Sequence, residues 1–156
     1  MAGPTLVTGA AGFAGSHLVE HLAGRGNLVA WTRRAVPESL APLATWQTID
    51  LLERDTVRRA ISELKPSIVY HCAGAPHVPQ SWHNTTESLS SNVLTTHYLL
   101  DSIRRAGVEC RVLITGSAMV YAPSATPITE AHPLAPSSPY GVCKLAQEQL
   151  GLRAIR

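Results

Sequence analysis

Cysteine is sparse in this sequence, which contains only Cys72, Cys110 and Cys143 among its 156 residues. The three lie far apart and form neither a CxxC pair nor a spacing that suits zinc. A small, odd number of cysteines favours a reducing compartment over a disulfide framework. We therefore interpret them as ordinary small side chains of a cytoplasmic protein.

An excess of charge of one sign is also lacking, because the formal net charge is only +2. No run rich in Lys and Arg occurs, so no nucleic-acid partner is expected. The N-terminus has no positively charged segment, and its glycines interrupt any apolar core of a signal peptide. Uncharged stretches such as residues 66–86 are cut by Pro, Gly and His, and therefore predict no membrane span and no membrane partner.

What is present is enough apolar sequence for one domain, since 45% of the residues are hydrophobic. Short apolar runs predict strands at residues 5–8, 28–31, 47–50, 67–73 and 111–116. Helical spacing predicts helices at about 13–23, 54–65, 87–106 and from 140 to the chain end. Strands and helices that alternate predict a parallel sheet covered on both faces. The predicted fold class is α/β, a Rossmann-like doubly wound parallel sheet of about five strands.

A glycine-rich turn joins the first predicted strand to the first predicted helix and reads TGAAGFAG at residues 8–15. In such a turn the first glycine permits a sharp bend and the second lets a pyrophosphate approach the backbone. The third lets helix and strand pack closely. Free N–H groups at the helix start would then face the phosphates. The turn predicts a dinucleotide site formed by Gly9, Gly12, Phe13, Ala14 and Gly15.

The end of the second predicted strand bears on which dinucleotide binds. An NAD site usually places an acid there, where it binds the ribose 2′-hydroxyl. Here Arg33 and Arg34 occupy the position instead. Guanidinium groups match a 2′-phosphate in charge and geometry, so the pattern favours NADP, with NAD as the alternative. Arginines that merely solvate a surface loop would give the same pattern.

Three residues near the other end of the chain suggest hydride-transfer chemistry. Ser117 follows the fifth predicted strand, and Tyr140 and Lys144 begin the last predicted helix, on one helix face. Reducing a carbonyl needs a proton donor, and the reverse reaction needs a base. A lysine ammonium and the charge of the nicotinamide would favour the tyrosine phenolate, while Ser117 would polarise the substrate oxygen. We therefore expect these three residues to be catalytic.

These segments together resemble the extended branch of the short-chain dehydrogenase/reductase family, which includes nucleotide-sugar epimerases, dehydratases and reductases. The matching motifs are TGAAGFAG, SNVLTT at residues 91–96, TGSAMVYA and PSSPYGVCK, although Thr95 replaces the usual glycine of the second. The resemblance implies that Asp50 and Leu51 contact the adenine. It also implies that Ala73, Gly74 and Ala75 line the ribose and pyrophosphate, and that Ser81 contacts the sugar. A homodimer is the expected assembly, with a nucleotide-sugar as substrate.

The resemblance leaves several activities open. Dehydratases of the family carry an acidic pair where this chain has Ala118 and Met119, which argues against dehydration. GAPHVPQSWHNT, at residues 74–85, looks most like GDP-4-keto-6-deoxy-mannose reductases. The main hypothesis is therefore 4-keto reduction with Tyr140 as acid/base. The alternatives are a nucleotide-sugar 4-epimerase, a ketone or sterol reductase, and a non-catalytic NAD(P)-binding sensor.

Two further expectations concern metal binding and extent. His71, His77 and His83 lie six residues apart with no carboxylate in obvious register, so no metal site is expected. Extended members of the family continue with further strands and a C-terminal substrate domain. The resemblance thus implies that residues 1–156 form an NAD(P)-binding Rossmann domain that is incomplete at its C-terminal end. We expect the isolated chain to be poorly active.

Overall fold

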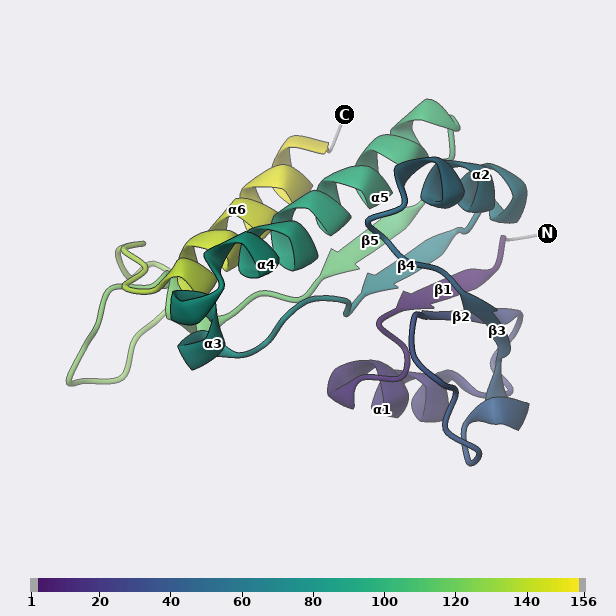
Figure 1. Ribbon diagram of the computed structural model, residues 1–156, viewed down its shortest axis with the longest axis horizontal. Helices are drawn as coiled ribbons and strands as arrows, with labels where there is room; N and C mark the ends of the chain where they lie inside the picture. Colours follow the sequence, from purple (N-terminus) through teal and green to yellow (C-terminus); the bar gives the residue numbers. More distant parts are fainter. Residues whose placement is uncertain (1–2, 155–156) are drawn as a thin grey trace.

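A five-stranded sheet forms the centre of the computed structural model, which describes residues 3–154 (Figure 1). Its strands are β1 (Thr5–Thr8), β2 (Leu28–Thr32), β3 (Thr45–Thr48), β4 (Ile68–His71) and β5 (Arg111–Ile114). All neighbouring pairs are parallel, and the order is β3-β2-β1-β4-β5. The predicted fold class is confirmed. The chain order reverses between β1 and β4, and in open sheets of this kind ligands bind at that switch point.

Within residues 3–154, six α-helices connect or cover the strands: α1 (Phe13–Leu22), α2 (Arg54–Leu64), α3 (Val78–His83), α4 (Thr85–Leu89), α5 (Thr95–Arg105) and α6 (Pro139–Ala154). Short 3₁₀ segments occur at η1 (Ala41–Leu43) and η3 (Ala118–Val120), and a π-helical segment, η2 (Ser90–Leu94), joins α4 to α5. Figure 1 shows α1 on one face of the sheet and α2, α5 and α6 on the other. Residues 155–156 lie outside the described part, so the helix expected to reach the chain end is described as far as Ala154.

Strands β4 and β5 each end two residues earlier than predicted, and two other predicted elements differ further from the structure. The single helix expected at residues 87–106 is α4, η2 and α5 in succession, because Asn92 in η2 is buried and its amide nitrogen also bonds to the carbonyl of Ala75, outside the helix, at 3.3 Å. The third strand lies two residues before its predicted position, at Thr45–Thr48. Gln47 there pairs with Trp31 and accepts a 2.7 Å hydrogen bond from the indole nitrogen of Trp31. Asp50 consequently lies beyond the strand.

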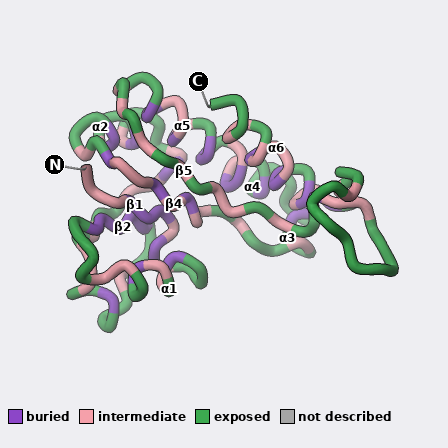
Figure 2. The backbone as a smooth tube through the Cα atoms, turned by 180° about the vertical axis from the view of Figure 1, so that it is seen from behind, coloured by how far each residue is buried: buried purple, intermediate pink, exposed green. Residues whose placement is uncertain are grey.

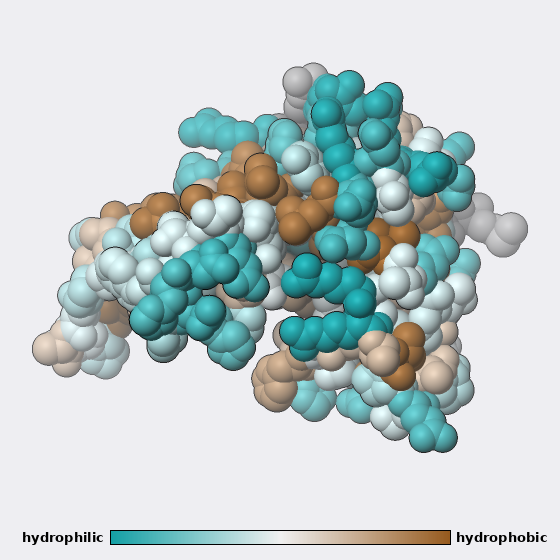
Figure 3. Space-filling view, in the orientation of Figure 1, coloured by the Kyte–Doolittle hydropathy of each residue, from teal (hydrophilic) through white to brown (hydrophobic). Residues whose placement is uncertain are grey.

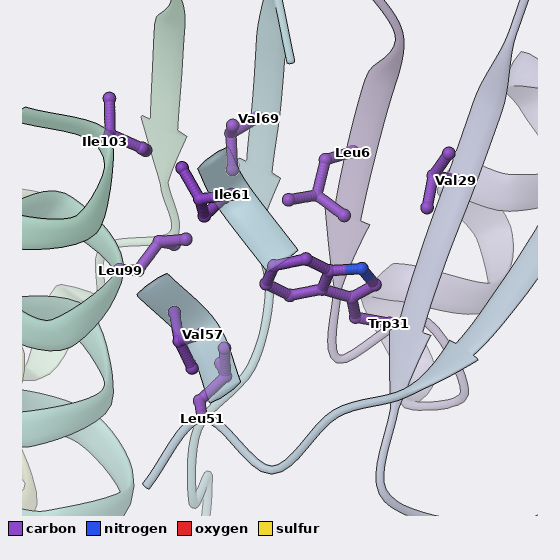
Figure 4. Close-up of a cluster of buried hydrophobic side chains, with 9 residues drawn as sticks. All are labelled: Leu6, Val29, Trp31, Leu51, Val57, Ile61, Val69, Leu99 and Ile103. Atoms are coloured by element: carbon purple, nitrogen blue, oxygen red, sulfur yellow. The ribbon is translucent and has the colours of Figure 1, made fainter. Parts of the chain in front are cut away.

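Hydrophobic side chains fill both faces of the sheet. The larger cluster, drawn in Figure 4, joins strand residues to α2 and α5 and comprises Leu6, Val29, Trp31, Leu51, Val57, Ile61, Val69, Leu99 and Ile103. The second cluster contains Val7, Ala10, Val19, Leu28 and Ala30 and packs α1 against the opposite face. Figure 2 shows that buried residues concentrate along β1, β2 and β4. Full burial of each large aliphatic side chain contributes about 1.5–3 kcal/mol.

The face of the molecule drawn in Figure 3 is most apolar over α5 and α6. Figure 3 shows a band of hydrophobic residues across the upper part of the molecule, over these helices. The exposed apolar side chains of α4 to α6 include Leu89, Leu94, Val142 and Leu152, and Leu113 of the edge strand β5 is half-exposed. No helix within residues 3–154 is long and apolar enough to cross a membrane.

Candidate active site

The glycine turn lies directly after β1, at the switch point of the sheet. Gly9 has a φ of +64°, in the left-handed region that favours glycine. A Cβ atom at Gly9 would lie 2.6 Å from the backbone nitrogen of Ala73, which follows β4. The turn is closed by the N–H of Gly12, which donates to the carbonyl of Gly9 at 2.9 Å. The ends of β1 and β4 therefore meet at a backbone contact that excludes any larger residue.

Helix α1 begins immediately after this turn, with Gly12 at its N-cap. Within the described chain no side chain caps this end, and Gly15 is buried against the turn. Phe13, the first residue of the helix, is 87% exposed. An uncapped helix N-terminus presents N–H groups and the positive end of the helix dipole to an anion. This end of α1 can therefore hold a phosphate group.

The residues proposed to select the cofactor lie at the ends of β2 and β3. Arg33 Nη1 is 3.8 Å from Asp50 Oδ2, and both side chains are about half-exposed. Asp50 also accepts a 2.9 Å hydrogen bond from the backbone nitrogen of Leu52. Arg34 is exposed, and its backbone nitrogen donates to the hydroxyl of Thr32 at 3.0 Å. A carboxylate thus reaches this edge from beyond β3, although β2 itself ends without one.

Small residues continue from the end of β4 along the same edge. The amide group of Asn92 holds this segment in place, because the backbone N–H of Ala75 donates to Asn92 Oδ1 at 3.1 Å. A Cβ atom on Gly74 would lie 2.5 Å from the same oxygen. Ala73, Gly74 and Ala75 therefore form a close-packed wall beside the glycine turn.

Ser117 follows β5 and begins the 3₁₀ segment η3. Its hydroxyl accepts a 3.2 Å hydrogen bond from the backbone nitrogen of Met119. A side chain at Gly141, in the first turn of α6, would collide with the carbonyl oxygen of Met119. Because Gly141 lacks one, η3 packs directly against the start of α6. The serine segment and the tyrosine of the predicted catalytic set therefore lie on adjoining elements.

The N-terminus of α6 is capped by two serines. Ser138 accepts a 3.1 Å hydrogen bond from the backbone nitrogen of Gly141. Ser81, from α3, accepts one from the backbone nitrogen of Tyr140 at 3.1 Å and donates its own proton to the carbonyl of Val78 at 2.6 Å. Ser81 is only 2% exposed. Its only proton is thus donated within the protein, so a sugar hydroxyl could contact Ser81 only by donating to the remaining lone pair of a nearly buried oxygen.

Lys144 lies one turn after Tyr140 and is 4% exposed, while Tyr140 is half-buried. Burial lowers the pKa of Lys144, and the nearby carboxylate of Glu148 opposes this effect. A buried ammonium close to a phenol stabilises the phenolate and so assists proton transfer by tyrosine. The arrangement suits acid/base chemistry near the carboxyl ends of the strands.

The three spaced histidines do not come together. His71 is buried at the end of β4, whereas His77 and His83 are exposed. Residues 3–154 contain no group of three or more His, Cys, Asp or Glu side chains placed to hold a metal ion.

Comparison with known proteins gives a consistent set of similarities. Residues 5–156 match the model of the NAD dependent epimerase/dehydratase family. A UDP-glucose 4-epimerase from Azospirillum brasilense is 33% identical over 96% of this chain and 46% of its own length. A GDP-6-deoxy-D-mannose reductase from Pseudomonas aeruginosa is 35% identical over 94% of this chain and 45% of its own length.

The solved structures agree with these sequence similarities. The structure of MoeE5 in complex with UDP-glucuronic acid and NAD superposes with a TM-score of 0.86 at 40% identity. The match covers 99% of this chain and 50% of that one. The chain therefore spans about half the length of the relatives that it matches. UDP-glucose 4-epimerases from other bacteria match at similar identity.

Proposed function

Because the chain belongs to the NAD dependent epimerase/dehydratase family, we propose that it carries the cofactor site and the acid/base residues of a UDP-sugar 4-epimerase. The observation that carries the proposal is the start of α6, which holds Tyr140 beside the Ser117 segment at the edge where the glycine turn lies. The predominance of UDP-glucose 4-epimerases among the relatives supports it. The epimerase alternative is thus better supported than the reductase favoured by sequence motifs.

The residues would divide the work as follows. NAD, when bound, would supply the hydride acceptor and donor for oxidation and reduction at C4. The Tyr140 phenolate would take the proton from the sugar 4-hydroxyl on oxidation and return it to the 4-oxygen on reduction. Lys144 stabilises that phenolate, and the Ser117 hydroxyl hydrogen-bonds the 4-oxygen. The net reaction inverts C4 and consumes no reductant.

The expected preference for NADP is not supported. Arg33 lies against Asp50, and a carboxylate at this distance opposes the approach of a 2′-phosphate. The solved MoeE5 complex contains NAD. We therefore propose NAD as the cofactor, with the ribose hydroxyls near the Arg33–Asp50 pair and the pyrophosphate at the start of α1.

A 4-keto-sugar reductase is the second candidate, because the Pseudomonas aeruginosa reductase is as similar as the epimerases. The same three residues would serve it, since reduction needs Tyr140 as proton donor. The two functions differ in their redox balance: a reductase oxidises one reduced cofactor for each sugar, whereas an epimerase oxidises none.

The test incubates the purified protein with UDP-glucose and NAD, and in parallel with a GDP-linked 4-keto-6-deoxyhexose and NADPH or NADH. The proposal predicts UDP-galactose in the first mixture, formed slowly because the chain spans about half the length of its relatives, with no lasting change in absorbance at 340 nm. Net loss of that absorbance with the keto sugar, and no UDP-galactose, would instead establish the reductase.

A further inference from the structure

A chain of buried polar side chains links the strand before the glycine turn to the helix that carries Tyr140 and Lys144. Thr8, the last residue of β1, lies with its hydroxyl 2.7 Å from Nδ1 of His71. His71 Nε2 lies 2.9 Å from the hydroxyl of Thr96 on α5. The amide nitrogen of Gln147, on α6, lies 2.7 Å from the same hydroxyl. Thr8, His71, Thr96 and Gln147 are each 0% exposed.

The donor and the acceptor of each hydrogen bond in this series of side chains can be assigned. The Thr96 hydroxyl lies 2.6 Å from the carbonyl oxygen of Asn92, which can only accept, so Thr96 donates its single proton there. Its other two neighbours must then donate to it. The Gln147 amide group therefore points its nitrogen at Thr96, and His71 carries its proton on Nε2. The bare Nδ1 of His71 accepts from Thr8.

His71 is suited to this task because it stays neutral. Burial, and secondarily the charge of Lys144, lowers its pKa from 6.5 to about 4. Near neutral pH one ring nitrogen therefore donates while the other accepts, and the hydrogen bonds from Thr8 to Gln147 keep the same donors and acceptors.

Gln147 occupies a particular place on α6. It follows Tyr140 by seven residues and Lys144 by three, a spacing that puts all three on one helix face. Its bond to Thr96 thus fixes the rotation of that face about the helix axis. The helix start is held separately, by Ser81 at the backbone nitrogen of Tyr140.

Stability alone does not favour a glutamine at this position. The side-chain oxygen of Gln147 is buried and has no hydrogen-bond partner within residues 3–154. A buried acceptor that lacks a protein partner has lost its hydration without compensation, a cost that an apolar side chain of similar volume would avoid. What the glutamine adds is a bond of fixed direction.

We propose that Gln147 is a positioning residue, which acts through Thr96 and His71 to hold the Tyr140–Lys144 face of α6 in register with the end of β1. The proposal rests on the proposed function for its effect on turnover. Its effect on Lys144 can be measured without turnover.

The test compares Gln147→Leu with Gln149→Leu, which changes an exposed glutamine two residues later on the same helix. We expect Gln147→Leu to lower kcat about tenfold, equivalent to ~1.4 kcal/mol, with KM and NAD affinity nearly unchanged and the unfolding free energy retained or raised. In a ¹³C NMR titration, the pKa of the Lys144 side chain should differ from the wild-type value. Gln149→Leu should match the wild type in every measurement.

A second pair of variants covers the case in which Gln147→Leu does not fold. Thr96→Val keeps the shape but removes the hydroxyl, and should shift the Lys144 titration, whereas Thr96→Ser should preserve it. If the wild type turns over no nucleotide-sugar but these titrations shift as stated, the positioning role stands and the proposed function falls. An unchanged Lys144 titration in Gln147→Leu and Thr96→Val overturns the positioning role, as does an unchanged kcat in an active protein.

Discussion

The hydroxyl of Ser81 lies 3.1 Å from the backbone nitrogen of Tyr140, although 59 residues separate the two in the chain. A side chain from α3 thereby caps the helix that carries the acid/base pair. The first N–H groups of a helix have no partner within the helix, so a cap from another element both satisfies one of them and fixes where the helix begins.

Replacing Ser81 by alanine should therefore weaken the fold and misplace Tyr140. Loss of a cap costs about 1 kcal/mol, which urea unfolding of Ser81→Ala would measure, and kcat should fall more than NAD affinity. The matched control is Ser137→Ala, an exposed serine in the segment before α6. Equal stability and equal kcat in the two variants would show that the cap has no such role.

The glycine turn permits a test that separates backbone strain from crowding. Gly9 and Gly24 both have φ values in the left-handed region, +64° and +74°. A Cβ atom at Gly24 meets nothing within 4 Å, whereas one at Gly9 meets the backbone of Ala73. Gly24→Ala should cost about 1 kcal/mol from strain alone, and Gly9→Ala clearly more, with loss of NAD binding. Calorimetric unfolding and NAD titration would measure both, and equal costs would exclude the backbone contact as the reason for Gly9.

The Arg33–Asp50 pair predicts how cofactor choice would change. Asp50→Asn removes the negative charge beside Arg33 and should raise the affinity for NADP several-fold relative to NAD, since a 2′-phosphate gains an unopposed guanidinium. Arg33→Ala in the same background should reverse the gain, and Arg34→Ala serves as the comparison. Isothermal titration with both cofactors measures the ratio. A wild type that already prefers NADP would contradict this account of the pair.

Burial of His71 predicts a dependence of stability on pH. Because its pKa falls from 6.5 to about 4 on folding, the unfolded chain binds a proton between these values that the folded chain does not. The stabilisation is complete above about pH 6.5 and is lost as the pH drops toward about 4. At ~1.4 kcal/mol for each pKa unit, the loss is on the order of 3 kcal/mol.

Urea unfolding at a series of pH values measures this loss. His71→Gln should flatten the profile in this window, whereas His17→Gln, at an exposed histidine, should leave it as in the wild type. A wild-type stability that stays constant from pH 6.5 to 4 would show that the pKa of His71 does not fall on folding.

Local sequence signals were sufficient for most of the fold. The bounds of β1 agree with the prediction, and those of α1 and α2 agree to within one residue. Their signals are local, since each depends on the apolar periodicity of the segment itself and on the Gly or Pro residues next to it. The third strand was misplaced by two residues because its register depends on the pairing of Gln47 with Trp31. The division of α4, η2 and α5 depends on Asn92 and its bond to Ala75, which propensity does not reveal.

The candidate site divides in the same way. Glycine spacing and the Tyr140–Lys144 interval are local and could be predicted, and their catalytic and binding roles stay predictions. By contrast, the hydrogen bond between Ser81 and Tyr140 joins residues 59 positions apart, and the one between Gln147 and Thr96 joins residues 51 positions apart. A buried glutamine within a helix looks like a surface residue until the packing of α5 against α6 is known. Sequence periodicity gave no signal for it.

The most direct test of the central claim, that Tyr140 is the acid/base of an NAD-dependent sugar epimerisation, measures the interconversion of UDP-glucose and UDP-galactose by Tyr140→Phe. Tyr98→Phe, which changes a tyrosine on α5, is the matched control, and NAD binding is measured in both. The account predicts that Tyr140→Phe binds NAD as the wild type does but loses at least about 10²-fold in kcat, while Tyr98→Phe keeps both. Turnover by Tyr140→Phe at the wild-type rate would contradict it.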